Sequence, residues 1–220
     1  MPPHSLITIA NSSDPYLPLE KSLRLSRKML EAFECYDARI MIVTKSTLVL
    51  RDIPLLKNIK KVVVSITLTT LNPSLVKKLE PFCPSPLARL KAMEKLAKYF
   101  PVVCRFDPLI YPLNTKAIKK VLQAIQQSGA RQVITSTYKV RTDNFKRMVR
   151  AFPEHEDVWR KLYQTQGEKM NGYSYLPQEM RTQLIEEVRS ISIQNGLAFS
   201  SCREGLNKGN TRLCDGSSWF

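Results

Sequence analysis

The stretch 61-KVVVSITLTTLNP-73 contains the pattern that decides the fold. Residues 62–66 form a β-branched apolar run, which favours a buried strand, and the run ends in hydroxyl-bearing residues up to Thr70. Asn72 and Pro73 then begin a helix, because proline at the first helical position lacks an N–H that would have no partner there. The stretch therefore predicts a strand that leads into a helix.

The same alternation repeats along the first 140 residues. We expect strands at residues 6–10, 39–43, 62–66, 102–106 and 133–138. We expect helices at residues 21–33, 53–59 and 115–128, and two helices between residues 72 and 99 that the proline-rich stretch 81–86 separates. Residues 142–195 read as helices, and residues 197–201 as one further strand.

Strands that alternate with helices predict parallel pairing with right-handed crossovers. We therefore predict an α/β fold, an incomplete (β/α) barrel or an open doubly wound sheet with the helices outside. Residues 1–140 would form the partial barrel core, and residues 141–220 a helical C-terminal extension with a short strand and a tail that contains Gly and Cys. A closed eight-stranded barrel typically needs about 250 residues, so we expect an open or incomplete one.

Length and composition exclude several classes of protein. The chain has 220 residues, of which 43% are hydrophobic and 24% charged, as in a globular domain. It contains no apolar run of about 18 residues, so we expect no membrane span, and the first residues do not resemble a signal peptide. We expect a cytoplasmic protein. Its 5 cysteines, an odd number at irregular spacing, argue against a disulfide framework.

The net charge of +15 is unevenly distributed. Residues 51–150 carry 20 basic and 5 acidic side chains and so account for the whole excess. A field of this sign favours a polyanionic partner, of which nucleic acid is the commonest. The alternative is a lysine-rich surface without a partner, as in a thermophile or a basic proteome.

Polar residues follow the predicted strands. They occur at residues 11–14, 44–46, 65–70, 105–107 and 135–137. The carboxyl ends of parallel strands meet at one edge of a sheet, where ligands bind in barrels and open sheets alike. Lys45 could hold a carboxylate or phosphate there, and Arg105 could bind a carboxylate through two hydrogen bonds. The alternative for each is a surface cation that begins a loop.

Several common motifs are missing from the sequence. With 7 glycines the chain has no glycine-rich phosphate loop of standard spacing. His4 and His155 have no second ligand at zinc spacing. Cys202 and Cys214 could contribute half of an iron–sulfur or zinc site, or could be free thiols, and free thiols are favoured because no two further ligands lie nearby in the sequence.

An ordered set of motifs resembles a known family. The motifs are SSDPYLPLEK (12–21), IVTKST (42–47), VVVSITLTT (62–70), LEPFCPSPLARLKAMEKL (79–96), CRFDPLIYPLN (104–114), CREGL (202–206) and CDGS (214–217). In this order they resemble the radical S-adenosylmethionine proteins related to spore photoproduct lyase, the DNA repair photolyase-like group. Each motif is loosely diagnostic alone, and the order of all of them makes the resemblance specific.

The resemblance implies a fold, two cofactors and a set of site residues. It implies a partial (β/α)6 barrel that binds S-adenosylmethionine against a [4Fe-4S] cluster to generate a 5′-deoxyadenosyl radical; in the lyase the substrate is a thymine lesion in DNA. Matched residue by residue, Ser13, Lys45 and Ser65 would hold the methionine carboxylate and ribose, and Arg105 is a further cofactor-binding candidate. The resemblance places Asn11, Asp14 and Tyr16 on the substrate face.

The sequence departs from the family pattern at two places. The lyase has a hydrogen-donating cysteine before the SSDP motif, where this chain has Asn11 in the run 10-ANSS-13, so an identical repair role does not follow. The CxxxCxxC loop that ligates the cluster is expected upstream of Leu6, and Cys35, Cys83 and Cys104 do not reproduce its spacing. We therefore expect a longer reading frame, or a second polypeptide, to supply the first βα unit.

Three hypotheses follow for the function. The first is a radical S-adenosylmethionine enzyme, with nucleic acid as a candidate substrate, that is inactive as this chain alone. The second is a non-catalytic α/β module that binds nucleic acid through the basic middle of the chain. The third is a degenerate fragment without an independent fold.

Overall fold

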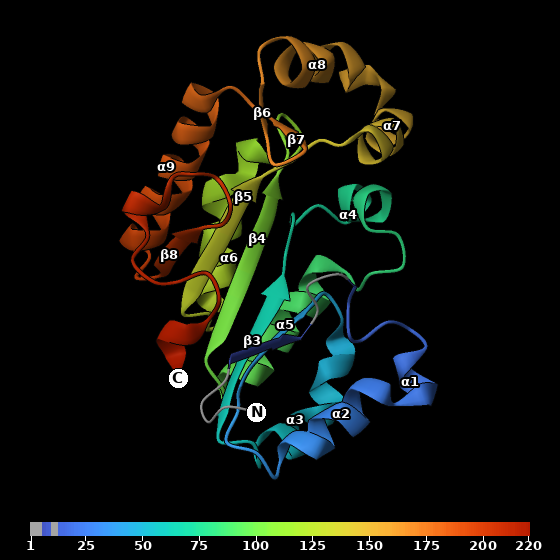
Figure 1. Ribbon diagram of the computed structural model, residues 1–220, viewed down its shortest axis with the longest axis vertical. Helices are drawn as coiled ribbons and strands as arrows, with labels where there is room; N and C mark the ends of the chain where they lie inside the picture. Colours follow the sequence, from blue (N-terminus) through green and yellow to red (C-terminus); the bar gives the residue numbers. More distant parts are fainter. Residues whose placement is uncertain (1–5, 10–12) are drawn as a thin grey trace.

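A curved parallel sheet organises the protein, whose computed structural model describes residues 6–9 and 13–220 (Figure 1). Six strands pair in the order β1-β2-β3-β4-β5-β8, and every neighbouring pair is parallel. The strands are β1 (Leu6–Ile9), β2 (Arg39–Thr44), β3 (Lys61–Thr67), β4 (Val102–Leu109), β5 (Gln132–Thr137) and β8 (Ala198–Ser201). The prediction of an α/β fold with parallel strands is confirmed.

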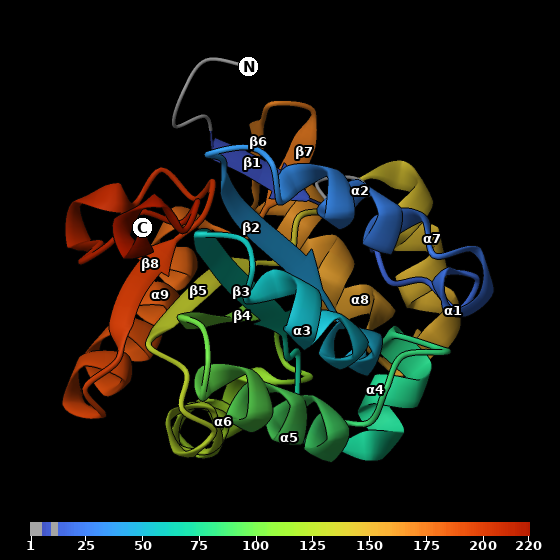
Figure 2. The same cartoon turned by 90° about the horizontal axis from the view of Figure 1, so that it is seen from below.

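Helices cover the outer side of this sheet. Figure 2 shows the sheet as an arc, with α2, α3, α5, α6 and α9 on its convex side. The α-helices are α1 (Glu20–Leu23), α2 (Leu25–Phe33), α3 (Ile53–Leu56), α4 (Pro73–Leu79), α5 (Pro86–Ala97), α6 (Ile118–Gln127), α7 (Thr142–Ala151), α8 (Glu156–Arg160) and α9 (Gln178–Gln194). The chain also contains short helices of other types. They are the 3₁₀-helices η1 (Thr47–Asp52), η2 (Thr115–Ala117), η3 (Pro153–His155), η5 (Asn207–Gly209) and η6 (Ser217–Trp219), and the π-helical turn η4 (Lys161–Thr165).

The helix starts that the sequence predicts at Asn72 and Ser85 are both observed. The Asn72 side chain accepts hydrogen bonds from the backbone N–H groups of Ser74 and Leu75, and Ser85 accepts one from Ala88. A proline occupies the first turn of each helix. Both helices are capped in the standard way, with a polar side chain on an otherwise unpaired donor.

The two faces of the sheet carry different clusters. On the outer face, Ile40, Ile42 and Val64 belong to the main core together with side chains of the covering helices. On the inner face, Met41, Val63, Val103 and Ile134 form a second, smaller cluster. Strand side chains alternate between faces, so neighbouring residues of one strand enter different cores.

The C-terminal segment covers part of the inner face. Cys214, Trp219 and Phe220 pack against the second cluster, and Trp219 donates its indole N–H to Gln132 Oε1 at 2.6 Å. Gly216 has a φ of 77°, and a Cβ there would lie 2.9 Å from the Met41 sulfur. A glycine is therefore required where the tail meets the sheet.

The sheet is open at both ends within the described residues, where β1 pairs with β2 alone and β8 with β5 alone. The fold is thus an incomplete barrel. β8 extends the same sheet that the strands of residues 1–140 form. Within residues 6–9 and 13–220, no helix is long and apolar enough to cross a membrane.

The expectation of helices alone over residues 142–195 is wrong at one place. An antiparallel hairpin of β6 (Glu168–Met170) and β7 (Tyr173–Tyr175) interrupts them. Its turn residues Asn171 and Gly172 have φ values of 50° and 76°. The Asn-Gly pair is a strong hairpin signal because both residues tolerate positive φ.

The expected helix at residues 21–33 is also divided. Arg24 takes a left-handed conformation, with φ 54° and ψ 33°, and so ends α1 and precedes α2. The Glu20 carboxylate accepts hydrogen bonds from the N–H groups of Ser26 and Arg27 and thereby caps the second helix. This contact between residues six and seven positions apart favours the break over a continuous helix.

We predict that Phe199→Ala lowers the free energy of unfolding by about 3–5 kcal/mol, because Phe199 is fully buried in β8 within the main core. Phe82→Ala is the matched control, since that ring is 95% exposed, and should change stability by less than about 0.5 kcal/mol. Urea unfolding followed by circular dichroism measures both. Equal stability of the two variants would contradict the placement of β8 in the core.

Candidate functional site

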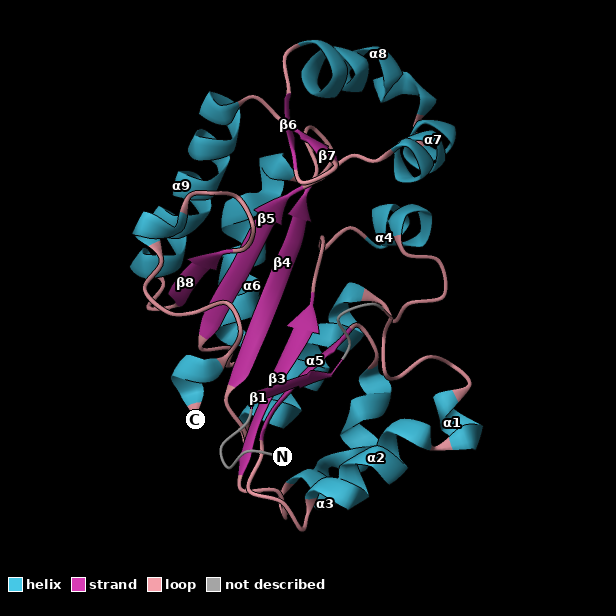
Figure 3. Ribbon diagram, in the orientation of Figure 1, coloured by secondary structure: helices cyan, strands magenta, loops and turns pink. Residues whose placement is uncertain are grey.

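The carboxyl ends of the sheet strands lie at one edge, toward which the arrowheads point in Figure 3. The loop that follows β1 continues from Ser13 to Tyr16, and Lys45 follows β2. Thr69 follows β3, Asp107 lies near the end of β4, and Thr137 ends β5. This edge therefore gathers hydroxyl, carboxylate and ammonium groups from segments far apart in the sequence.

Asp14 attaches the loop after β1 to the end of β2. Its Oδ1 accepts hydrogen bonds from the Thr44 hydroxyl at 2.6 Å and the Tyr16 backbone N–H at 2.9 Å. Its Oδ2 accepts one from the Lys45 backbone N–H at 2.7 Å. The aspartate of the SSDP motif thus joins two of the motifs that the sequence analysis identified, and it brings Asp14, Tyr16 and Lys45 together.

Lys45 belongs to a buried charge cluster around Glu80. The Lys45 ammonium lies 3.2 Å from Glu80 Oε1, and the fully buried Arg89 guanidinium lies 2.7 Å from Oε2. The Thr69 hydroxyl donates to Oε1 at 2.7 Å. Burial opposes ionisation of Glu80, but Lys45, Arg89 and this hydrogen bond outweigh it and hold its pKa below the ordinary value. The Glu80 carboxylate is therefore ionised at neutral pH.

A cavity of about 660 Å³ opens beside this cluster. Its lining includes Asp14, Tyr16, Lys45, Phe82 and Cys83. Tyr16 is 3% exposed and packs in the main core, and burial raises its pKa, with the Asp52 charge adding to the effect. The cavity thus combines an apolar wall with the ammonium groups of Lys21 and Lys45 and the Arg51 guanidinium.

Ser65 and Arg105 lie on the inner face of the sheet, apart from that cavity. Ser65 follows Val63 by two residues in β3, and Arg105 follows Val103 by two residues in β4, so all four share the inner face. The Ser65 hydroxyl and Arg105 Nε are buried and have no hydrogen-bond partner among the described residues. Buried polar atoms are normally paired, so these two atoms fit a polar ligand on the inner face.

The remaining candidates from the sequence occupy different positions. Ser13 is exposed, and Asn11 lies outside the described residues. The Arg105 guanidinium donates to the Cys214 carbonyl at 3.3 Å and lies 3.9 Å from Asp107. The structure therefore divides the predicted set into a group at the cavity and a group on the inner face.

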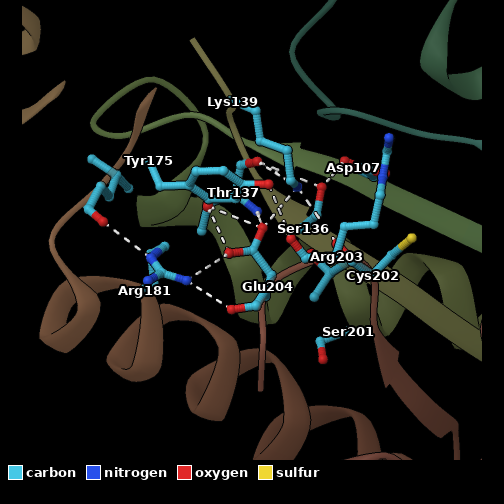
Figure 4. Close-up of polar contacts among 12 residues, drawn as sticks. Asp107, Ser136, Thr137, Lys139, Tyr175, Arg181, Ser201, Cys202, Arg203 and Glu204 are labelled. Carbon is cyan, nitrogen blue, oxygen red and sulfur yellow. Dashed lines mark hydrogen bonds and ion pairs between the residues drawn. The ribbon is translucent and has the colours of Figure 1, made fainter. Parts of the chain in front are cut away.

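A buried network around Glu204 was not anticipated from the sequence (Figure 4). The Glu204 carboxylate is fully buried and accepts hydrogen bonds from the Thr137 N–H at 2.8 Å and the Lys139 ammonium at 2.8 Å. The Arg181 guanidinium donates to the Glu204 carbonyl at 2.7 Å and to Glu168 at 2.6 Å. The network fixes the loop after β8 to the end of β5. Its only sequence signal is the CREGL motif, because the partners of Glu204 lie far from it in the sequence: Thr137, Lys139 and Arg181 are 67, 65 and 23 positions away.

Cys202 and Cys214 form no disulfide within the described part of the chain. Across the described ranges 6–9 and 13–220, no three His, Cys, Asp or Glu side chains form a group that could hold a metal ion. These residues therefore do not supply the ligands of a [4Fe-4S] cluster, whereas the Ser65 hydroxyl and Arg105 Nε are available to a polar ligand.

Comparison with known proteins identifies the fold. No family model matches the chain. Two variants of spore photoproduct lyase, one of them solved with dinucleoside spore photoproduct, superpose with TM-scores of 0.69 and 0.71 at 16% identity. They match 90% and 91% of this chain and 61% and 62% of theirs. The chain therefore has the α/β fold of spore photoproduct lyase.

Two relatives are similar in sequence. An uncharacterized protein of Methanocaldococcus jannaschii is 38% identical over 90 residues, which are 41% of this chain and 34% of that protein. An uncharacterized protein of Acidianus two-tailed virus is 34% identical over 128 residues, 57% of this chain and 42% of that protein. The matched regions span less than half the length of either relative.

We predict that Glu80→Gln lowers the free energy of unfolding by about 3 kcal/mol at pH 7, because it leaves the buried Arg89 guanidinium without its counter-ion. The folded-state pKa of Glu80 is depressed, so the stability it contributes is present above its unfolded pKa and is lost as pH falls through the folded value. The difference between wild type and variant should therefore shrink below about pH 4.5.

Urea unfolding between pH 3 and pH 7 measures this difference. Asp143→Asn is the control, since it removes an exposed ion pair with Arg147 and should cost less than about 0.5 kcal/mol. A Glu80→Gln variant as stable as wild type at pH 7 would show that the cluster does not depend on this charge.

Proposed function

We propose that the protein is the S-adenosylmethionine-binding part of a radical enzyme similar to spore photoproduct lyase. One observation carries the proposal: the lyase fold places the unpaired Ser65 hydroxyl on the inner face of the sheet, at a position where the sequence motifs match the cofactor-binding residues of that family. S-adenosylmethionine supplies a carbon-centred radical that removes a hydrogen atom from a substrate. The matched motifs, in order along the fold, support this function.

Lys45 at the cavity and Ser65 on the inner face would contact different parts of the cofactor. The Lys45 ammonium can leave Glu80 for a ligand carboxylate, because Arg89 remains on Glu80 at 2.7 Å and keeps that charge compensated. The Ser65 hydroxyl can donate to a carboxylate or ribose oxygen without losing an existing partner. Asp14 holds the loop that carries Ser13 against the backbone of Lys45.

The iron–sulfur cluster would be held by residues outside those described. The proposal assigns its ligands to a further segment of the same protein or to a second polypeptide. Such a unit would pair with the open edge of β1, where the described part of the chain has no partner strand.

We predict that the chain binds S-adenosylmethionine and that Ser65→Ala and Lys45→Met each weaken binding about tenfold, or about 1.4 kcal/mol. Ser65→Ala removes a hydroxyl that has no partner in the described part of the chain, so its stability should match wild type. Lys98→Met, on the exposed end of α5, is the control and should bind as wild type. Isothermal titration calorimetry measures all four proteins.

Unchanged affinity in both site variants would contradict the proposed binding site. Activity has a separate test, in which the chain is reconstituted anaerobically with iron, sulfide and the polypeptide encoded directly upstream. Formation of 5′-deoxyadenosine would support the enzyme, and the absence of both cluster absorbance and 5′-deoxyadenosine would refute catalysis.

A second observation favours a nucleic-acid-binding role, alone or as the way the enzyme holds its substrate. The elements α7, α8 and the β6–β7 hairpin lie beyond the carboxyl ends of β4 and β5 (Figure 1). Residues of these elements line a cavity of about 700 Å³. Its lining carries four cations, Arg141, Lys146, Arg160 and Lys169, with Asp143 and two aromatic rings. The Arg141 guanidinium stacks 3.9 Å from the centre of the Tyr173 ring. Cations beside aromatic rings suit the phosphates and bases of single-stranded nucleic acid.

We predict that the chain binds single-stranded DNA with an affinity that falls steeply with salt, and that Lys146→Gln reduces the slope of log K against log salt by about 0.7, the loss of one phosphate contact. Fluorescence anisotropy with a labelled oligonucleotide between low and physiological salt measures the slope. Lys98→Gln, on the opposite side of the sheet, is the charge-matched control and should leave it unchanged. Equal slopes for the two variants would exclude this cavity as the DNA contact.

A further inference from the structure

Two cysteines meet on the inner face of the sheet. Cys202 follows β8, and its backbone N–H donates to the Thr135 carbonyl at 2.9 Å. Cys214 lies in the C-terminal segment, where the Gln132 side chain donates to the neighbouring Leu213 carbonyl at 3.1 Å. Both thiols pack against the inner-face cluster, and each lies within hydrogen-bonding reach of the other. Two separate anchors to the sheet therefore hold the pair together.

The pair has an arginine beside it and a way to solvent. The Arg105 guanidinium donates to the Cys214 carbonyl at 3.3 Å and is close enough to hydrogen-bond the Cys202 sulfur. Both cysteines are half-buried and line a cavity of about 640 Å³. Arg203 and Arg212 also line it, and no acidic side chain does among the described residues. A small anionic molecule can therefore reach the two sulfur atoms.

We propose that Cys202 and Cys214 form a thiol–disulfide exchange site for small acidic disulfides, with Cys202 as the attacking thiolate, Cys214 as the resolving thiol and Arg105 as the cation that stabilises the thiolate. No cluster ligand or S-adenosylmethionine takes part, so the inference is independent of the proposed radical chemistry.

The electrostatics agree with this division of roles. The hydrogen bond from the Cys214 thiol, followed by the Arg105 charge, lowers the pKa of Cys202 to about 6 against the effect of burial. The hydrogen bond to Cys202 and burial raise the pKa of Cys214. The other ionisable groups that act on the pair are Asp107 on β4 and Asp215 in the tail, and both oppose the thiolate. One proton is thus shared by two sulfur atoms at neutral pH.

The exchange takes two steps, each a displacement at sulfur. The Cys202 thiolate attacks one sulfur of the disulfide RS–SR, so that a Cys202–SR bond forms, the RS–SR bond breaks and one thiolate leaves. Cys214 then loses its proton to solvent and attacks Cys202, which forms the internal disulfide and releases the second thiolate. The two cysteines are oxidised by two electrons, and the small disulfide is reduced to two thiols. A dithiol reductant reverses the reaction.

The first test measures the pH at which Cys202 becomes reactive. The full chain is alkylated with iodoacetamide between pH 5 and pH 9, and trypsin cleavage after Arg203 and Arg212 places the two cysteines in different peptides for mass spectrometry. We expect a midpoint near pH 6 for Cys202, against about 8.5 for an ordinary thiol. The pH midpoint of alkylation, and not the rate at pH 7, distinguishes Cys202 from an ordinary thiol. A low pKa also lowers the nucleophilicity of the thiolate and leaves the rate at pH 7 within a few-fold of an ordinary thiol.

Arginine variants test the role of the cation. Arg105→Met should raise the midpoint by about one unit, and Arg105→Lys should leave it within about half a unit of wild type. Thermal melting of each variant checks that it is folded. A midpoint near 8.5 in the wild-type protein, or equal midpoints in a folded Arg105→Met variant and wild type, would overturn the assignment.

The second test uses two disulfides of opposite charge. Glutathione disulfide, which is acidic, should link the Cys202 and Cys214 peptides several-fold faster than cystamine, which is cationic, and dithiothreitol should separate them again. Cys214→Ser should instead retain glutathione on Cys202. The exposed Cys35 is the internal control and should gain no internal link. Absence of the linked peptide, or faster reaction with cystamine, would refute the site.

Discussion

The burial of both faces of a parallel sheet is the constraint on which the rest of this structure depends. Parallel strands joined by helical crossovers bury the outer face under helices, and the apolar side chains of that face form the main core. The inner face has no such layer. Here the C-terminal segment covers the cluster of Met41, Val63, Val103 and Ile134. Polar side chains that share this face, such as Ser65, are therefore removed from water without a backbone partner.

Buried charge sets the geometry of the carboxyl edge. Glu80 lies between Lys45 and Arg89, and Glu204 lies beside Lys139 and Arg181. Burial of an unpaired carboxylate costs several kcal/mol, so each acid fixes the loops that carry its partners. The cluster around Glu80 positions the loop after β2, and the cluster around Glu204 attaches the loop after β8 to the end of β5. The ion pairs of Glu80 and Glu204 thus hold in place the loops that surround the candidate ligand groups.

Two kinds of chemistry can share the inner face, with Arg105 within reach of both. Ser65 offers an unpaired hydroxyl for the proposed cofactor, and Cys202 and Cys214 offer a dithiol beside Arg105. Arg105 contacts the cysteine group through the Cys214 carbonyl, although the sequence motifs place it with the cofactor ligands. The side chain lies on the central strand β4, from which it can act on either group.

The sequence by itself determined the strands, the crossover helices and their caps, because β-branched runs, Asn72-Pro73 and Ser85-Pro86 act on the backbone within a few residues. It also contained the Asn171-Gly172 hairpin signal, which the helical reading of that region overlooked. Only the tertiary structure decided the contacts of Lys45 with Glu80, Thr137 with Glu204 and Arg105 with Cys214. Those contacts join residues 35 to 109 positions apart. They follow from strand order and register, which local backbone preferences do not encode.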